Sequence, residues 1–427
     1  MFPALFVLIL AGLPISFGLI ATSLVFGWIA FGHSLGLQLF NRVTEITSSF
    51  VFAAVPMFIL MGALLERSGT AERLFTALHL FLGRLRGGVA LAAMLMGGIF
   101  AAATGIIGAV EIVIGLMTLP IMLAHRYDKG LISGTITAAG SLGTIIPPSV
   151  LCVVYGQIGQ LPITDLFAGC LIPGLMMVAL FMGYITLRGI LDPAAGPAVQ
   201  SVLEPGMRSR VLVSGLLPPA ILIAAVLGSI LAGIASPTEA GAVGALGAIV
   251  LAAAHGRLGP TVMLESLRTT MRVTSFIMLI VLGGMMFASI FQVLGGQRLI
   301  AAAIELAALP RAGTIAFFLA IVFLLGFVLD WATIVLLTVP IFAPIVRQLG
   351  IEPIWFAVLM IVTLQTSYLT PPMAPAIFYL RSIAPPEITY GDMVRGVVPF
   401  IICQLLVLAL VGLWPPTATW LPGLLGG

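Results

Sequence analysis

Residues 138–149 read AAGSLGTIIPPS and residues 363–373 read TLQTSYLTPPM, and these two stretches decide the fold. Each lies inside a long apolar run. Two consecutive prolines remove two amide donors and clash with the preceding turn, so a helix has to stop there. The runs are therefore predicted to be helices broken near their middle, over 130–160 and 353–383.

The composition around these breaks is that of a membrane protein. Hydrophobic residues make up 61% and charged residues 8% of the 427 residues, against a charged share of about 25% in soluble domains. Windows without charged residues, many long enough for a spanning helix of roughly 20 residues, recur at 1–41, 46–65, 87–110, 130–164, 166–187, 211–238, 273–297, 353–380 and 396–427. We expect an all-α polytopic membrane protein with about ten to twelve crossings plus re-entrant pieces.

A weak internal repeat runs through the chain. The paired prolines at Pro147 and Pro371 lie 224 residues apart, Pro14 and Pro237 lie 223 apart, and Leu119-Pro120 matches Val339-Pro340 at 220. The chain is therefore divided into a first transmembrane repeat (1–188), an extramembrane linker (189–210) and a second repeat (211–427). Repeats with broken helices in matching places are typical of secondary transporters. A duplicated scaffold without transport activity is the alternative.

Each repeat also contains a pair of short apolar segments before its broken helix, at about 88–124 and 312–346. Glycines and one acid interrupt each pair, with Gly105, Gly108 and Glu111 in the first and Gly326 and Asp330 in the second. Segments this short predict re-entrant helical hairpins rather than full crossings.

Both breaks are rich in hydroxyl groups, which suggests a binding site. A half-helix that ends at a proline pair leaves free carbonyls, and the next half-helix begins with free amides. Carbonyls and hydroxyls suit a hard cation such as Na⁺, whereas amides at a helix N-terminus suit a carboxylate. The hydroxyl residues are Ser141, Thr144, Ser149, Thr366, Ser367 and Thr370. The alternative is that the prolines only kink helices for packing.

Two isolated acids, Glu111 and Asp330, lie between apolar runs. A carboxylate within a membrane is costly and usually functional, so both are candidates for ion or proton coupling, although either could instead cap a helix or lie in water. Glu239 is predicted to be structural, because Ser236 and Pro237 precede it in the pattern of a capped helix start.

Other motifs argue against an enzyme, an ATP-driven pump and a nucleic-acid-binding protein. Lys129 is the only lysine, so there is no Walker A loop, and no basic tract is present. The four histidines are too dispersed for a zinc helix motif, and there is no G-x-S-x-G elbow.

The chain resembles a known transporter family in four segments: PMFILMGALLERSG (56–69), HRYDKGLISGTITAAGSLGTIIPPS (125–149), ASPTEAGAVGA (235–245) and LDWATIVLLTVPIFAPIVRQLGIEPIWFAVLM (329–360). These look like the large membrane (M) subunit of tripartite ATP-independent periplasmic (TRAP) transporters. The resemblance implies a multi-pass protein of the bacterial inner membrane with an elevator-type, ion-transporter-like architecture.

The resemblance also implies partners and a coupling ion. The expected partners are a small membrane subunit (Q), a periplasmic substrate-binding protein (P), a small organic acid and membrane lipid, with Na⁺ as coupling ion and no cofactor. A stand-alone anion:cation symporter or antiporter of similar fold is the alternative.

Together, the breaks and the resemblance predict two sets of site residues. The substrate-binding set is Thr104, Gly105, Pro147, Pro148, Ser149, Thr370, Pro371 and Pro372. The Na⁺ set is Gly140, Ser141, Gly143, Thr144, Gly326, Asp330, Thr366 and Ser367. The chain departs from the family pattern at Ile106 and Ile107, where hydroxyl residues are common, and at Gln365, where an acid is common. These departures suggest a distinct substrate, such as an oxo- or hydroxy-acid or a more apolar carboxylate.

Overall fold

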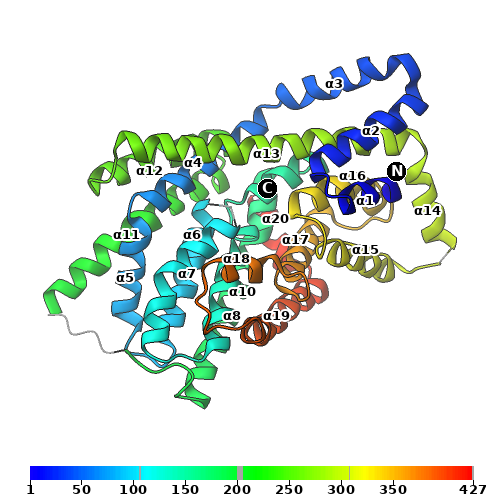
Figure 1. Ribbon diagram of the computed structural model, residues 1–427. Coiled ribbons are helices and arrows are strands. Elements are labelled where there is room, and N and C mark those ends of the chain that lie inside the picture. The colour runs from blue at the N-terminus through cyan, green and yellow to red at the C-terminus, as the bar shows by residue number, and fades with distance from the viewer. Residues whose placement is uncertain (105–106, 200–204, 307, 426–427) are drawn as a thin grey trace.

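A computed structural model describes residues 1–104, 107–199, 205–306 and 308–425, and its regular elements within these ranges are helices (Figure 1). They are α1 (Phe2–Leu10), α2 (Ile15–Phe31), η1 (Gly32–Ser34), α3 (Leu35–Thr47), η2 (Phe50–Ala53), α4 (Ala54–Arg67), α5 (Thr70–Leu82), α6 (Gly88–Thr104), α7 (Ile107–Ala124), α8 (Lys129–Ser141), η3 (Leu142–Thr144), α9 (Val150–Gly159), α10 (Ile163–Leu191), α11 (Pro205–Leu231), α12 (Pro237–Ala254), α13 (Pro260–Val293), α14 (Gly296–Leu306), α15 (Arg311–Leu325), α16 (Trp331–Gln348), α17 (Pro353–Leu369), α18 (Pro375–Ile383), α19 (Tyr390–Leu413) and α20 (Pro416–Leu425).

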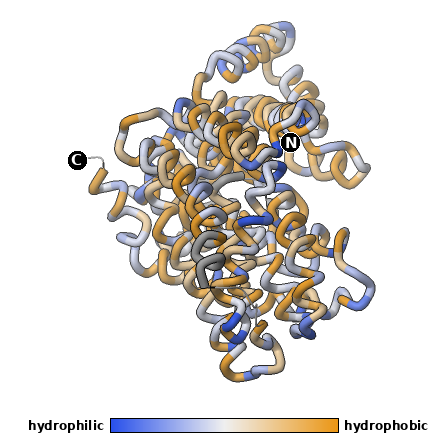
Figure 2. The backbone as a smooth tube through the Cα atoms, turned by 90° about the vertical axis from the view of Figure 1, so that its left-hand side faces the viewer, coloured by the Kyte–Doolittle hydropathy of each residue, from blue (hydrophilic) through white to orange (hydrophobic). Residues whose placement is uncertain are grey.

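Eight helical segments of the described residues are long and apolar enough to cross a membrane, and hydrophobic residues predominate along most of the helices (Figure 2). The expected ten to twelve crossings plus re-entrant pieces stay a prediction, because these eight are selected by length and composition. Further apolar helices are shorter, at 10–17 residues, and include α9, α15 and α17. These belong to the hairpins and broken helices, and the prediction of an all-α polytopic fold is confirmed.

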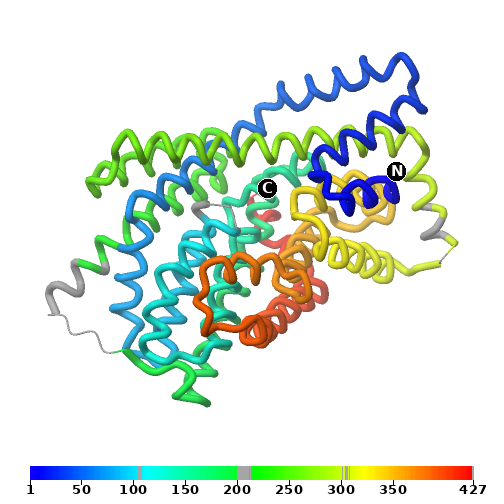
Figure 3. Tube along the Cα trace, in the orientation of Figure 1, coloured from blue at the N-terminus to red at the C-terminus, as the bar shows by residue number. Residues whose placement is uncertain are grey.

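Both predicted breaks are present. The first broken helix consists of α8, the 3₁₀ turn η3 and α9, and the second consists of α17 and α18. The Pro147–Pro148 and Pro371–Pro372 peptide bonds are both cis. The hairpins are α6 with α7 and α15 with α16, and they lie on opposite sides of the second broken helix, in cyan and yellow (Figure 3).

Corresponding helices of the two repeats contact each other. Ser141 at the end of α8 and Gln365 in α17 are 224 residues apart, the same offset as the proline pairs, and their side chains are hydrogen-bonded. Helices α10 and α19 also meet, since the rings of Phe181 and Phe400 are 5.2 Å apart. Equivalent positions can touch in this way only close to a pseudo-twofold axis, so the two breaks face each other near that axis.

Close backbone contact joins α8 to α19. A Cβ on Gly396 would overlap the carbonyl oxygen of Gly130, and a Cβ on Gly134 would overlap the carbonyl oxygen of Gly396. Small residues allow membrane helices to approach this closely. The first break is therefore held tightly against a helix of the second repeat.

Helix α13 forms the backbone of a separate layer of helices. Its 34 residues correspond to about 51 Å, well beyond the roughly 30 Å of a bilayer core. It lies alongside α2 and α4, and α12 packs on α4 (Figure 1). We refer to α2, α4, α12 and α13 as the scaffold layer.

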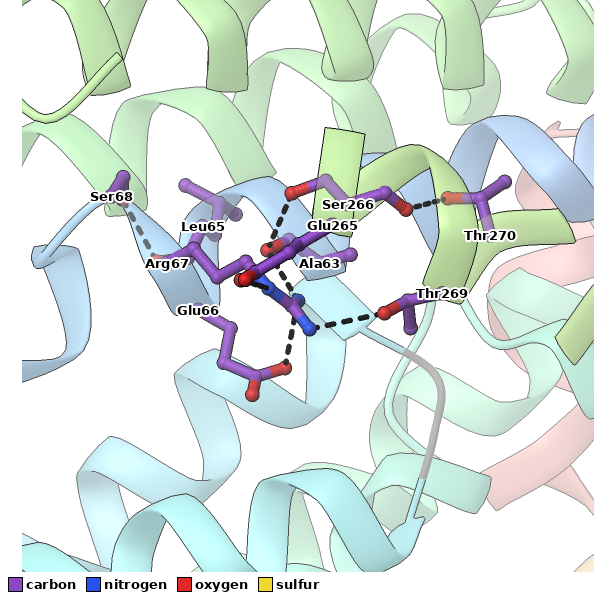
Figure 4. A network of polar contacts seen from close by, with 9 residues as sticks. All are labelled: Ala63, Leu65, Glu66, Arg67, Ser68, Glu265, Ser266, Thr269 and Thr270. Atoms are coloured by element: carbon purple, nitrogen blue, oxygen red, sulfur yellow. Dashed lines mark hydrogen bonds and ion pairs between the residues drawn. The ribbon is translucent and has the colours of Figure 1, made fainter. Parts of the chain in front are cut away.

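A polar network ties α4 to α13 within this layer (Figure 4). The guanidinium of Arg67 donates to Thr269 Oγ1 at 3.0 Å and lies 3.7 Å from the carboxylate of Glu265. Ser266 Oγ donates to the carbonyl of Ala63 at 3.4 Å. Several partly buried polar contacts between two helices fix their relative position, so we expect α4 and α13 to move together.

The predicted extramembrane linker, residues 189–210, includes the ends of two helices. Helix α10 continues to Leu191 and α11 begins at Pro205. The intervening chain is also docked on the first repeat, where Gly87 N donates to Gly196 O and Asp128 N donates to Ala195 O.

The predicted structural role of Glu239 is confirmed. Its carboxylate accepts from Ser236 N at 2.8 Å, and Ser236 Oγ accepts from Glu239 N at 3.3 Å, which forms a capping box at the start of α12.

Candidate functional site

A cavity of about 580 Å³ lies where the second hairpin meets the second broken helix. Its wall includes the hairpin tip (residues 326–332), the end of α17 and the start of α18. The first repeat contributes Gly108 from its hairpin and Val150 from the start of α9, and α13 contributes Val273, Phe276 and Ile277. One cavity therefore receives residues from both repeats and from the scaffold layer.

The wall of this cavity is mostly aromatic and aliphatic. Six aromatic side chains line it, namely Phe276, Phe327, Trp331, Tyr368, Phe378 and Tyr379. Its few polar side chains include Asp330 and Ser367, and none of the described lining residues is lysine, arginine or histidine. Such a wall favours a ligand with an apolar body and a limited number of polar groups.

Asp330 caps α16 from the tip of the second hairpin. Its carboxylate accepts from Ala332 N at 3.0 Å, from Thr333 N at 3.4 Å and from Thr333 Oγ1 at 2.5 Å. These donors and the positive end of the helix stabilise the negative charge. The same tip needs a glycine at 326, because a Cβ there would overlap the side chain of Ser367 on α17.

The hydroxyl groups of the breaks donate to nearby backbone carbonyls. Ser141 Oγ donates to Ala138 O, Thr144 Oγ1 to Ser141 O, and Ser149 Oγ to Thr144 O, all at 2.8–2.9 Å. In the second break, Thr370 Oγ1 donates to Thr366 O at 2.7 Å. Fewer carbonyls are free than the sequence predicted, because neighbouring hydroxyls fold back onto them. Each hydroxyl oxygen keeps lone pairs that can accept from a donor or bind a cation.

A buried polar cluster lies between the two breaks. Gln365 Nε2 from α17 and Gln404 Nε2 from α19 approach Ser141 Oγ at 3.2 and 3.5 Å. All three side chains are buried, and within the described part of the chain the Oε1 atoms of both glutamines have no hydrogen-bond partner. Buried acceptors without partners are costly, and they are the kind of atom that coordinates a hard cation.

The chain matches the family model of the tripartite ATP-independent periplasmic transporter DctM component over residues 2–417. The chain belongs to this family. It is thus a large permease subunit of a TRAP transporter, a multi-pass protein of the bacterial inner membrane, and its relatives are permease subunits and not enzymes.

Three relatives illustrate the range of the family. The C4-dicarboxylate TRAP transporter large permease protein DctM of Pseudomonas aeruginosa is 30% identical over 92% of this chain and 90% of that protein. The sialic acid permease protein SiaM of Vibrio cholerae is 29% identical over 98% of this chain and 97% of its own length. The ectoine/5-hydroxyectoine permease protein UehC of Ruegeria pomeroyi is 28% identical over the same shares, 98% and 97%.

A solved structure supports the same fold. The YdaH transporter of Alcanivorax borkumensis, which is described as having an unusual topology, matches with a TM-score of 0.64 at 18% identity, over 94% of this chain and 96% of that one. The likeness concerns the architecture alone. The expected transporter-like fold of this TRAP subunit is confirmed.

The structure distributes the predicted site residues unevenly. Gly326, Asp330 and Ser367 line the cavity. Pro147, Pro148 and Ser149 are buried and do not line it, although the next residue does. In the second break, Thr370, Pro371 and Pro372 also lie off the wall, between the lining residues Tyr368 and Met373. Gly105 lies outside the described residues, as does the side chain of Thr104.

The remaining predicted Na⁺ residues are buried around the breaks. Gly140, Ser141, Gly143 and Thr144 are within or next to the turn η3, and Thr366 donates its hydroxyl to Val362 O at 2.8 Å. Of these, Ser141 belongs to the polar cluster, whereas Gly140 leaves room for the side chain of Glu111.

Gln404 and the aromatic wall were missed by sequence reasoning. Gln404 is the single amide in an apolar helix, which is a signal for a buried polar contact that could have been used. The aromatic residues gave no such signal, because Phe, Trp and Tyr in membrane helices most often serve packing or interfaces.

Proposed function

We propose that this chain is the permease of a Na⁺-coupled, ATP-independent importer of a small organic acid. The acid is delivered by a periplasmic binding protein, and a small membrane subunit completes the transporter. The observation that carries the proposal is the 580 Å³ cavity walled by both repeats, in a family of large permease subunits.

The chemistry of the breaks supports Na⁺ as the coupling ion. Gln365 Oε1 and Gln404 Oε1 are buried acceptors without partners next to Ser141 Oγ. In secondary transporters, Na⁺ is coordinated by unwound backbone carbonyls at broken helices, and a glutamine side chain offers a carbonyl oxygen of the same neutral kind. Ser141, Thr144, Gln365 and Gln404 would hold the ion.

The cavity wall supports an organic acid with an apolar body. Aromatic side chains and a volume within the usual 300–1,000 Å³ range of small-molecule sites would enclose the body. The described wall offers no basic side chain for the acid group, so we propose that this group faces the positive N-terminal end of α18, which attracts anions.

The proposed movement is elevator-type. The hairpins and broken helices would carry the cavity across the bilayer as one unit. The scaffold layer would stay in place, held by the contacts of Arg67 with α13. The supporting observation is that residues of α13 line the cavity, so the moving unit would slide along this helix.

The test is uptake into proteoliposomes that contain this chain, the small subunit and the binding protein. Radiolabelled succinate, sialic acid, ectoine and benzoate are offered in turn under an inward Na⁺ gradient. We expect uptake of one of these acids that requires both the gradient and the binding protein. If uptake with all three components present is the same with and without the Na⁺ gradient, the proposed Na⁺ coupling is wrong.

The same assay separates the alternative. A stand-alone symporter or antiporter of this fold accumulates its acid when the binding protein is left out. The matched control therefore omits only the binding protein. Full uptake in that control would show that transport does not depend on the binding protein, and it would favour the stand-alone mechanism.

A further inference from the structure

Glu111 is a buried acid that the proposed site does not use. It is wholly buried in α7, and neither of its carboxylate oxygens has a hydrogen-bond partner among the residues that the structure describes. It lies at the fifth residue of α7, beyond the first-turn amides that a capping residue would satisfy. Its role is therefore neither a cap nor a solvent-exposed charge.

The fold makes room for this side chain. A Cβ placed on Gly140 would lie 2.6 Å from the Cβ and 3.0 Å from the Cγ of Glu111. Only glycine at 140, one residue before Ser141, lets α7 and α8 pack with the acid between them. Glu111 thus lies against the end of α8, beside the first break.

The groups that face Glu111 supply no counter-charge. Helix α6 has no titratable residue, and Lys129 of α8 is eleven residues from Gly140, about 16 Å along the helix. Tyr379 of α18 packs on Gly108, three residues before Glu111 in α7, and both Tyr379 and Tyr368 of α17 line the cavity.

The other nearby helices also bring no positive charge close to Glu111. Arg381 of α18 is exposed. His79 of α5 interacts with His125, at the base of the hairpin, about 21 Å along α7 from Glu111. Among the described residues no ion pair involves Glu111.

We propose that Glu111 is a cation site of the transport cycle, and that it carries one monovalent cation, a proton or a sodium ion, beside the substrate cavity. A buried carboxylate without partners is strongly unfavourable, so the ionised group requires a bound cation. This deepens the proposed function and rests on it for its place in the transport cycle. Two observations support this proposal: Glu111 packs closely against Gly140, and its two carboxylate oxygens lack partners among the described residues.

The first experiment measures cation-dependent stability, which does not require transport. Thermal unfolding of the purified chain is followed in detergent, in choline chloride or sodium chloride, at pH 6.0 and 8.5. A cation bound by the folded state raises the unfolding temperature. The variant is Glu111→Gln, which keeps the shape, and the control is Glu72→Gln, an exposed acid of α5.

In choline at pH 8.5 we expect Glu111→Gln to unfold at a higher temperature than the wild type, because the variant buries no charge. Lower pH or added sodium should narrow the difference between the wild type and the variant, and the condition that narrows it identifies the cation, because the proposed sodium site at Gln365 and Gln404 is present in both proteins. Glu72→Gln should respond like the wild type. Parallel responses of the wild type and Glu111→Gln to both cations would overturn the proposal.

The second experiment counts charges in the complete transporter. The membrane potential that stops net substrate flux is measured for the wild type and Glu111→Gln. We expect one fewer positive charge per substrate in the variant, and an unchanged count would overturn the proposal. If the complete transporter shows no uptake at all, the proposed function fails, while the stability experiment still decides whether Glu111 binds a cation.

Discussion

At the scale of single residues, the buried polar side chains of the site differ in how far their hydrogen bonds are satisfied. Asp330 has its carboxylate occupied by the start of α16. By contrast, Gln365 and Gln404 each leave an oxygen without a partner while their amides approach Ser141 Oγ. Stability alone does not explain such a cluster, because apolar residues of the same shape would avoid the unsatisfied acceptors.

This argument predicts opposite effects of Gln404→Leu on stability and on ion binding. Without sodium the variant should be more stable than the wild type by about 1 kcal/mol, since one orphaned acceptor is removed. Its sodium affinity should fall, because an oxygen ligand is lost. Thermal unfolding across a sodium titration measures both quantities.

The control for this substitution is Gln38→Leu, at an exposed glutamine of α3, which should change neither quantity. A variant at Gln404 with unchanged sodium affinity would remove this residue from the proposed ion site.

A second prediction at this scale concerns the hairpin tip. Asp330→Ala removes the acceptor of three hydrogen bonds at the start of α16, and loss of an N-cap costs about 0.5–2 kcal/mol. We expect Asp330→Asn, which can still cap, to retain most of the stability. If Asp330→Asn nevertheless loses sodium-dependent uptake, the charge itself has a role in coupling. Equal uptake in Asp330→Asn and the wild type would limit Asp330 to capping.

At the scale of helices, the breaks owe their position to both prolines and glycines. Paired prolines end α8 and α17, and glycines let the broken helices approach their neighbours. Gly130 and Gly134 of α8 face Gly396 of α19 with direct backbone contact. The rigidity of the first break therefore depends on α19, a helix of the other repeat.

Substitution of Gly396 by alanine should therefore be destabilising. In an ordinary helix position Gly→Ala gains about 1 kcal/mol, but a Cβ at 396 would overlap the carbonyl oxygen of Gly130. The control is Gly183→Ala in α10, where no atom lies within 4 Å of the added Cβ, and which should be neutral or stabilising. Thermal unfolding of both variants checks the difference, and equal shifts would contradict the packing argument.

At the scale of the whole molecule, charge is distributed unequally between the bases of the two hairpins. The base of the first hairpin carries Arg84, Arg86, Arg126 and Lys129, whereas the base of the second carries Arg311 and Arg347. These bases lie at different ends of the molecule, at the left and the right of Figure 1. Cytoplasmic loops of membrane proteins are enriched in lysine and arginine, so the base of the first hairpin is expected in the cytoplasm.

Cysteine labelling in intact cells tests this orientation. Cys152, Cys170 and Cys403 are buried, so a membrane-impermeant maleimide should report mainly on introduced residues. Arg311→Cys should react from the periplasm, while Arg126→Cys should react only after the cells are permeabilised. Both positions are exposed, and the reverse pattern would invert the assignment.

The all-helical membrane fold, the two hairpins and the two breaks could be predicted from the amino-acid sequence alone. These features follow from local chemistry. A proline pair stops a helix wherever it stands, and apolar runs must be helical in a bilayer because every backbone group has to be paired. The capped start of α12 at Ser236 and Glu239 was predictable for the same reason.

Which of these features contact one another depends on the packing of the helices in three dimensions. It brought Ser141 to Gln365 and Gln404, set Glu111 against Gly140, and left the first proline pair buried while aromatic residues lined the cavity. Contacts between residues more than 200 positions apart depend on how the helices pack, and packing depends on shape over many side chains at once. No local pattern records this information, which is why the partners of Gln404 and the cavity wall could not be identified from the sequence.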